Sequence, residues 1–308
     1  MNAPSTIMRQ PASRSELLKR RLDAFSRALT GLSRDDVRAL HRARVASRRL
    51  RELMPVLQFE PATARKLSRR LRRVTLRLGA VRELDVMLMS IDELHVSRRG
   101  RGAALGRVGV SVSKDRDRAR KRLADRMPIE AMKRLVRKLE RRLAALQVEE
   151  ASMTRADARR WRWAVDALVA RRAARLAEAM EKAGAVYLPD RLHVVRVALK
   201  KLRYATELAQ EASGIRDMAR LRLLQRGQDV LGRIHDLHLL MDRVRDVQAS
   251  LTPPTLVEWR DLDALIASLE DDCRRLHARY MALREALAAT AGASHTRARG
   301  SGSARRAG

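Results

Sequence analysis

The chain has 308 residues and a formal net charge of +31, from 67 Lys and Arg against 36 Asp and Glu. Excess charge destabilises a compact protein by self-repulsion, so a folded protein that carries it usually has an anionic partner. An apolar content of 45% excludes a mostly disordered chain, and no uncharged run is long enough to cross a bilayer. The first residues also lack the apolar core of a signal peptide, so we expect a cytoplasmic protein without membrane partners.

Helix signals run along nearly the whole chain, whereas alternating strand patterns are almost absent. Residues 1–12 and 291–308 have the composition of disordered tails. Between them, Ser13 and Glu16 form a capping box before a first helix that ends near Gly31. The sequence therefore predicts a helical fold between two tails.

Proline and glycine residues divide the rest of the chain into further helices. Pro61 suits the first turn of a long helix, and Pro128, Gly184 and Pro189 mark breaks further on. We expect helices over residues 13–31, 33–57, 61–96, 103–126, 128–148, 154–183, 190–213, 216–249 and 255–289.

Two pairs of segments repeat along the chain at almost the same offset. His41–Arg51 (HRARVASRRLR) matches His193–Arg203 (HVVRVALKKLR) at an offset of 152 residues. Leu78–Leu88 (LGAVRELDVML) matches Leu231–Met241 (LGRIHDLHLLM) at an offset of 153. Two independent matches in the same order indicate an internal duplication.

The duplication predicts the architecture of residues 13–290. We expect an all-α fold of two antiparallel helical bundles, related by a pseudo-twofold axis, with about four main helices each. The copies span residues 13–150 and 151–290. A basic groove is expected between them, because each copy turns a matching basic stripe away from its apolar face.

Each stripe lies on one face of a predicted helix, opposite the apolar residues around Leu50 in the first copy and Leu202 in the second. The first stripe consists of His41, Arg44, Arg48 and Arg51. The second stripe consists of His193, Arg196, Lys200 and Arg203. Duplicated solvent-facing residues have no packing reason to match in type and phase, so the stripes favour a shared binding surface over solvated helix faces. The two histidines fit a capping or core role equally well.

A second basic row is predicted on the helix after each stripe. In the first copy the row consists of Arg69, Arg73, Arg77 and Arg82. The offset of 153 carries it onto Arg222, Arg226 and His235, while Val230 takes the place of Arg77. Side chains one helical turn apart stand about 5–6 Å from one another, so the four rows predict a track for repeating phosphates. Glu83 and Asp236 are expected to orient arginines through ion pairs.

The pattern HxxRVAxRRLR, LGxVRELDV, HxxRVAxKKLRY and LGxIHDLH resembles the CHAD family, the conserved-histidine α-helical domain. The resemblance covers roughly residues 13–290, with the motifs in the expected order. It implies two pseudo-symmetric helical bundles around a basic channel and non-enzymatic binding of inorganic polyphosphate, without metal or cofactor. It also implies an association with polyphosphate granules. It places the binding positions of the family on the two stripes. The ExExK motif of the CYTH domain, to which the family is often fused, is missing, which implies a stand-alone CHAD protein.

An enzyme is the first alternative that the residues leave open. A metal-dependent phosphohydrolase of the HD type is also all-helical, and His193, His235 with Asp236, and a later Asp261 or Asp263 would supply its ligands in order. The surrounding arginines oppose a divalent cation, however. The single Cys273 also excludes a CxxC zinc site.

Binding of nucleic acid without sequence preference is the second alternative, since backbone phosphates supply most non-specific affinity. The chain has three Trp, three Tyr and two Phe, few for proteins that stack single-stranded bases. Amides that read adenine are scarce as well, with Asn2 the one asparagine. The composition therefore favours a polyanion without bases and leaves duplex binding open.

Overall fold

The structure is a computed structural model that describes residues 7–8, 10–32, 37–97, 102–251 and 256–303. Within these residues the chain forms nine α-helices and is an all-α protein. The N-terminal half contains α1 (Arg14–Leu32), α2 (Val37–Leu53), the short 3-10 helix η1 (Met54–Val56), α3 (Pro61–Ser97), α4 (Gly102–Arg126) and α5 (Ile129–Ala151). The C-terminal half contains α6 (Arg155–Ala183), α7 (Pro189–Ser213), α8 (Met218–Ala249) and α9 (Leu256–Ser303).

The helix starts follow the capping signals of the sequence. Ser13 Oγ accepts a hydrogen bond from the backbone N–H of Glu16 at 3.2 Å, and the Glu16 carboxylate accepts one from the Ser13 N–H at 3.1 Å. The predicted capping box is therefore confirmed. Helix α3 begins at Pro61 as expected, because a first-turn residue needs no N–H for the helix.

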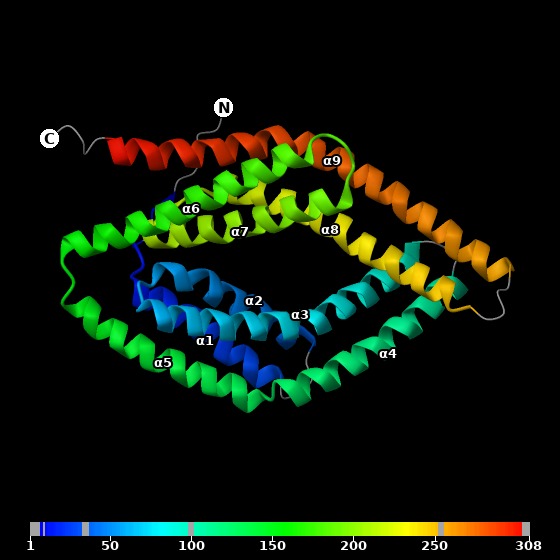
Figure 1. The fold of residues 1–308 in the computed structure, drawn as a ribbon, viewed down its shortest axis with the longest axis horizontal. Coiled ribbons are helices and arrows are strands. Elements are labelled where there is room, and N and C mark those ends of the chain that lie inside the picture. Colours follow the sequence, from blue (N-terminus) through cyan, green and yellow to red (C-terminus); the bar gives the residue numbers. More distant parts are fainter. Residues whose placement is uncertain (1–6, 9, 33–36, 98–101, 252–255, 304–308) are drawn as a thin grey trace.

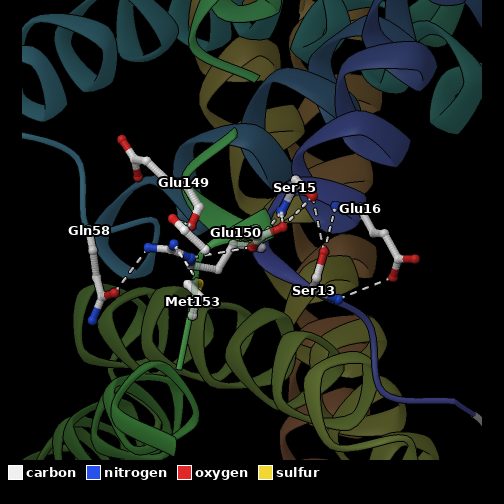
Figure 2. A network of polar contacts seen from close by, with 9 residues as sticks. Ser13, Ser15, Glu16, Gln58, Glu149, Glu150 and Met153 are labelled. Carbon is white, nitrogen blue, oxygen red and sulfur yellow. Dashed lines mark hydrogen bonds and ion pairs between the residues drawn. The ribbon is translucent and has the colours of Figure 1, made fainter. Parts of the chain in front are cut away.

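Residues far apart in sequence hold the N-terminus of α1 in place (Figure 2). The buried Arg14 guanidinium pairs with Glu150 of α5 at 3.4 Å and donates to Gln58 at 3.1 Å. The same Glu150 carboxylate accepts hydrogen bonds from the backbone N–H and the hydroxyl of Ser15. The network ties α1 to α5 and to Gln58 in the connection between η1 and α3, and so holds the helix that packs against α2.

The two halves differ in their number of helices, where about four main helices each were expected. Pro128 separates α4 from α5 in the N-terminal half, because proline lacks the N–H that would continue the helix. Helix α9 instead continues without a break through Ser303. It packs against both α8 and α6, whereas α4 packs on α3 and α5 packs on α1. Figure 1 shows α4 and α5 along one long edge of the molecule and α9 along the opposite edge.

Two apolar clusters form the core. The larger one joins α1, α2, α3 and α5 with α6, α7 and parts of α8 and α9. The smaller one packs the end of α3 and the start of α4 against α8 and α9. Across the two halves α2 contacts α7 and α3 contacts α8. These two contacts bring the repeated sequence segments next to each other.

Contacts also extend into the segments with tail-like composition. Ile7–Met8 forms strand β1, which pairs antiparallel with β2 (Ile215–Arg216). The backbone N–H of Ala12 donates to the carbonyl of Glu211 at 3.0 Å. Helix α9 passes residue 291, where Ala291 is buried. Within the described residues, no helix combines the length and apolar character needed to span a membrane.

Candidate functional site

Four helices from both halves line a cavity of about 150 Å³, here called the central pocket. Helices α2 and α3 contribute from the N-terminal half, and α7 and α8 from the C-terminal half. Five of the fifteen residues predicted from the sequence line it: His41, Arg44, Arg82, Arg196 and His235. The remaining lining residues are Glu83, Val86, Met87, Asp236 and Leu239. The repeated helices thus meet at one site.

Helical periodicity explains why the basic stripes face this site. On α2, Ala43 and Leu50 are fully buried in the core, which leaves Arg44 about a third of a turn away on the face toward α7. On α7, Val195 and Leu202 are fully buried in the same way. The apolar faces predicted from the sequence are therefore confirmed. Because the apolar faces of α2 and α7 pack into the core, the basic stripes of both helices lie at the contact between α2 and α7.

The arginines of the central pocket crowd one another. Burial lowers the pKa of Arg44 to about 10, helped by the neighbouring charge of Arg48, while Glu83 opposes the shift. Burial also lowers the pKa of Arg196, against the attraction of Asp236. The Nε atoms of Arg44 and Arg82 are buried and donate to no acceptor in the described part of the chain. The pocket therefore presents unpaired donors that an anion would satisfy.

Two carboxylates face these arginines. Glu83 and Asp236 line the central pocket beside Arg82 and Arg196. Burial raises the pKa of Asp236, although Arg196 acts in the opposite direction. Asp236 attracts Arg196 electrostatically and Glu83 attracts Arg44. The two carboxylates offset only part of the positive charge of the arginines that line the central pocket.

The histidines of the second copy lie against each other. His193 Nδ1 is 3.2 Å from His235 Nδ1, and the two ring centroids are 4.6 Å apart. Burial lowers the pKa of His235 to about 4, with further contributions from Arg196 and His193. His235 is therefore neutral at pH 7 and offers a hydrogen bond rather than a charge. Burial and then Arg82 and other arginines also lower the pKa of His41.

Lys200 is the most perturbed cation of the stripes. Burial lowers its pKa to about 7, and Arg48, Arg196, Arg44 and Arg51 add repulsion in that order. No acidic side chain forms an ion pair with Lys200 within the chain segments described above. The amine therefore sits among arginines from both halves at the border between charged and neutral forms.

The structure places several predicted residues away from the central pocket. Arg77 donates to the backbone carbonyl of Arg126 at the end of α4, so it caps a helix. Arg51 pairs with Glu52 at 3.3 Å. The exposed side chains of the second rows line none of the cavities named here: Arg69, Arg73, Arg222 and Arg226.

Arg203 is held by residues that the sequence reasoning did not single out. It pairs with Glu207, donates from Nε to Gln228 at 2.8 Å, and lies over the Tyr204 ring at 4.6 Å. Tyr204 also accepts a hydrogen bond from Arg48 at 3.3 Å. Its position directly after the second stripe, in a chain with three tyrosines, is the signal by which Tyr204 could have been found.

The structure does not assemble the ligand set of an HD-type hydrolase. No group of three His, Cys, Asp or Glu side chains suited to a metal ion occurs in the part of the chain that the structure describes. His193 and His235 do come together. Asp261 and Asp263 lie on α9, however, and do not line the central pocket.

Comparison with protein families matches the CHAD domain over residues 16–245, and no CYTH domain is matched. The chain therefore belongs to the CHAD family. Its fold resembles the crystal structure of the CHAD domain from the plant Ricinus communis, with a TM-score of 0.61 and 21% identity over 93% of this chain and 98% of that one. It also resembles PptA from Streptomyces chartreusis, with a TM-score of 0.58 and 19% identity over 88% and 98% of the two chains. Comparison with curated proteins gives no match.

Proposed function

We propose that this CHAD protein binds inorganic polyphosphate in the central pocket, without chemical turnover, through cations from both halves of the chain. The observation that carries the proposal is the meeting of Arg44 and Arg82 with Arg196 around one cavity. Two of these arginines keep a buried Nε donor unpaired. Arginine forks bind phosphate oxygens through paired hydrogen bonds, so a phosphate chain would satisfy these donors and offset their repulsion.

The lining chemistry supports polyphosphate over nucleic acid. Among the described residues, no Trp, Tyr or Phe lines the central pocket, so a base would find no aromatic stacking platform there. CHAD domains are associated with polyphosphate, and the bound chain would bring the protein to polyphosphate granules. The exposed rows contribute long-range attraction in this proposal, because charges near a binding site raise the local concentration of an anionic ligand. They are Arg69, Arg73, Arg222 and Arg226.

A pseudo-twofold relation between the halves is part of the proposal. Helix α1 packs on α2 as α6 packs on α7, and α3 packs on α4 as α8 packs on α9. Reciprocal ion pairs also cross between the halves, with Arg21 bound to Glu211 at 3.1 Å and Arg172 to Glu52 at 3.2 Å. These paired contacts support a binding groove to which each copy contributes the same elements.

Calorimetric titration with long-chain polyphosphate tests the proposal. The pair Arg44→Ala with Arg82→Ala removes cations of the N-terminal half, and Arg196→Ala with Lys200→Ala removes those of the C-terminal half. Each pair should weaken binding about 100-fold or more, since a hydrogen bond to a charged group contributes about 1.5–3 kcal/mol. Wild-type affinity should also fall steeply with salt, because binding releases condensed counterions.

A matched control removes the same charge elsewhere. Arg134 and Arg141 are exposed on α5 and line no cavity named here, so Arg134→Ala with Arg141→Ala should cost less than about threefold. Equal losses in all three variants, with helicity intact by circular dichroism, would mean that overall charge drives binding. Displacement of polyphosphate by duplex DNA at equal phosphate concentration would instead favour the nucleic-acid alternative.

A further inference from the structure

A separate cavity of about 350 Å³ lies where the start of α1 meets the start of α6 and the end of α7, and is here called the α1/α6 pocket. None of its lining residues lines the central pocket. Residues 11–14 and Glu150 line it from the N-terminal half, and residues of α6 with Ala212 of α7 line it from the C-terminal half. Ligand pockets in proteins usually measure about 300–1,000 Å³, so this volume suits a small organic molecule.

The segment before α1 forms one wall of the α1/α6 pocket. Strand β1 pairs with β2 in the connection between α7 and α8, and the Ala12 N–H donates to the carbonyl of Glu211. These contacts hold the segment against the end of α7, and Pro11 and Ala12 join Ala212 in the lining. A ligand in the pocket would therefore contact both halves of the chain at once.

The walls of the α1/α6 pocket are largely apolar. The short side chains of Ala12, Ala158 and Ala212 leave space that Met153 and the Trp161 ring border. Trp161 is 4% exposed, and its Nε1 is buried and donates to no acceptor within the described residues. A buried donor without a partner is costly. Because Trp161 lines the pocket, an acceptor on a bound molecule would satisfy this donor.

The charged residues of the α1/α6 pocket favour an anion. Arg14, Arg155 and Arg162 line it, against the single acidic residue Glu150. Glu150 is already bound to Arg14 and Ser15 (Figure 2). Arg155 and Arg162 are exposed and form no ion pair in the part of the chain that the structure describes. Their guanidinium groups can therefore bind a carboxylate or phosphate, and Arg155 begins α6, where the helix dipole also favours negative charge.

We infer that the α1/α6 pocket binds a small organic anion, with its apolar body between the alanines and Trp161 and its carboxylate or phosphate head at Arg155 and Arg162. The inference goes beyond the proposed function, because inorganic polyphosphate has no apolar body to fill these walls. Ligand pockets typically combine such apolar walls with a few polar groups that orient the ligand. The bound molecule would link the segment before α1 to α6 and α7.

Calorimetric titration with 2-naphthoate and 2-naphthyl phosphate tests the inference, since each joins an apolar body to one anionic head. Both should bind with dissociation constants on the order of 100 µM, as expected from the ligand efficiency of small molecules. 2-Naphthamide keeps the body without the charge, and acetate keeps the head without the body. Each of these should bind at least about tenfold more weakly. Tripolyphosphate at saturation should not displace 2-naphthoate, because it occupies the central pocket.

Two substitutions act on the walls of the α1/α6 pocket. Ala158→Leu fills the cavity and should weaken binding of both naphthyl probes at least about tenfold. Ala158 is only half-buried, so the fold should be kept, and circular dichroism checks its helicity. Trp161→Phe keeps an aromatic ring but removes the N–H donor, and it should weaken binding about threefold to tenfold.

A charge variant and its matched control complete the test. Arg155→Ala with Arg162→Ala should weaken binding of both naphthyl probes about tenfold. Arg159→Ala with Arg171→Ala removes two exposed arginines of α6 that do not line the pocket, and it should change the affinity less than about twofold.

Five results would each overturn the inference. They are no binding of either naphthyl probe to wild type, 2-naphthamide binding as tight as that of 2-naphthoate, displacement of 2-naphthoate by tripolyphosphate, unchanged binding by a folded Ala158→Leu variant, and equal losses in the charge variant and its control. Polyphosphate titration of the same variants keeps this test apart from that of the central pocket, because the proposed function predicts unchanged polyphosphate binding by Ala158→Leu.

Discussion

Replacement of Lys200 by methionine should stabilise the free protein and weaken its binding of polyphosphate. Methionine keeps most of the volume of the half-buried stem and removes an amine that four arginines repel. The fall in the Lys200 pKa from 10.5 to about 7 corresponds to about 5 kcal/mol at 1.36 kcal/mol per unit. Solvent screening reduces the realised gain to on the order of 1–2 kcal/mol, which raises the melting temperature by about 2–6 °C.

The pH dependence of this gain follows from the direction of the shift. The unfolded chain holds the Lys200 proton up to about pH 10.5, whereas the folded chain releases it near pH 7. Folding is therefore penalised most below pH 7, and the penalty fades as the pH rises toward 10.5. The advantage of Lys200→Met should be largest at pH 6 and small at pH 10.

Differential scanning calorimetry at pH 6, 8 and 10 measures this advantage, and titration with polyphosphate measures the loss of affinity, which should be about tenfold at pH 6. Lys121→Met removes an exposed lysine of α4 and should change neither quantity. The reasoning is refuted if Lys200→Met lowers the melting temperature of the free protein, or if it binds polyphosphate as tightly as wild type.

Three further outcomes follow from the contacts of single residues. Arg77→Ala should lower the free energy of unfolding by about 1 kcal/mol in urea titrations, because Arg77 caps α4 at the Arg126 carbonyl. Its polyphosphate affinity should stay within about twofold of wild type. A large loss of affinity would mean that Arg77 contacts the ligand. Glu150→Ala should destabilise the fold by about 3 kcal/mol in the same assay, because it leaves the buried Arg14 guanidinium without its carboxylate partner. An unchanged urea midpoint would show that this ion pair does not stabilise the fold. Wild-type affinity for polyphosphate at constant ionic strength should fall from pH 6 to pH 9 as Lys200 loses its proton, whereas Lys200→Met should give a flat profile.

Local patterns in the sequence determined the helices and their orientation. Ser13 and Pro61 fixed two helix starts, since capping depends on residues within one turn. The spacing of Leu50 and Leu202 fixed which faces are buried, because an apolar stripe of helical period has only one way to face a core. The duplication predicted that residues around His41 and His193 belong to related sites, since both copies carry the same pattern.

Which basic residues meet was decided only by tertiary packing. Arg44 and Arg82 reach the central pocket, while Arg77, five residues before Arg82 in the same predicted row, turns to the end of α4. Arg203 shares a stripe with Arg196 yet is held by Glu207 and Gln228. Glu207 lies one turn further along the same helix, but Gln228 and the Arg126 carbonyl belong to other helices, and the helical wheel of one segment carries no information about those.

The perturbed ionisation of Lys200 also belongs to the tertiary structure. A pKa near 7 requires burial between α2 and α7 together with arginines from both halves, and burial is a property of the packed chain. The sequence by itself determined that this protein concentrates positive charge on repeated helices. Only the packing of those helices decided where the cations lie close enough together for a bound anion to relieve their repulsion, because repulsion grows as distance and solvent exposure fall.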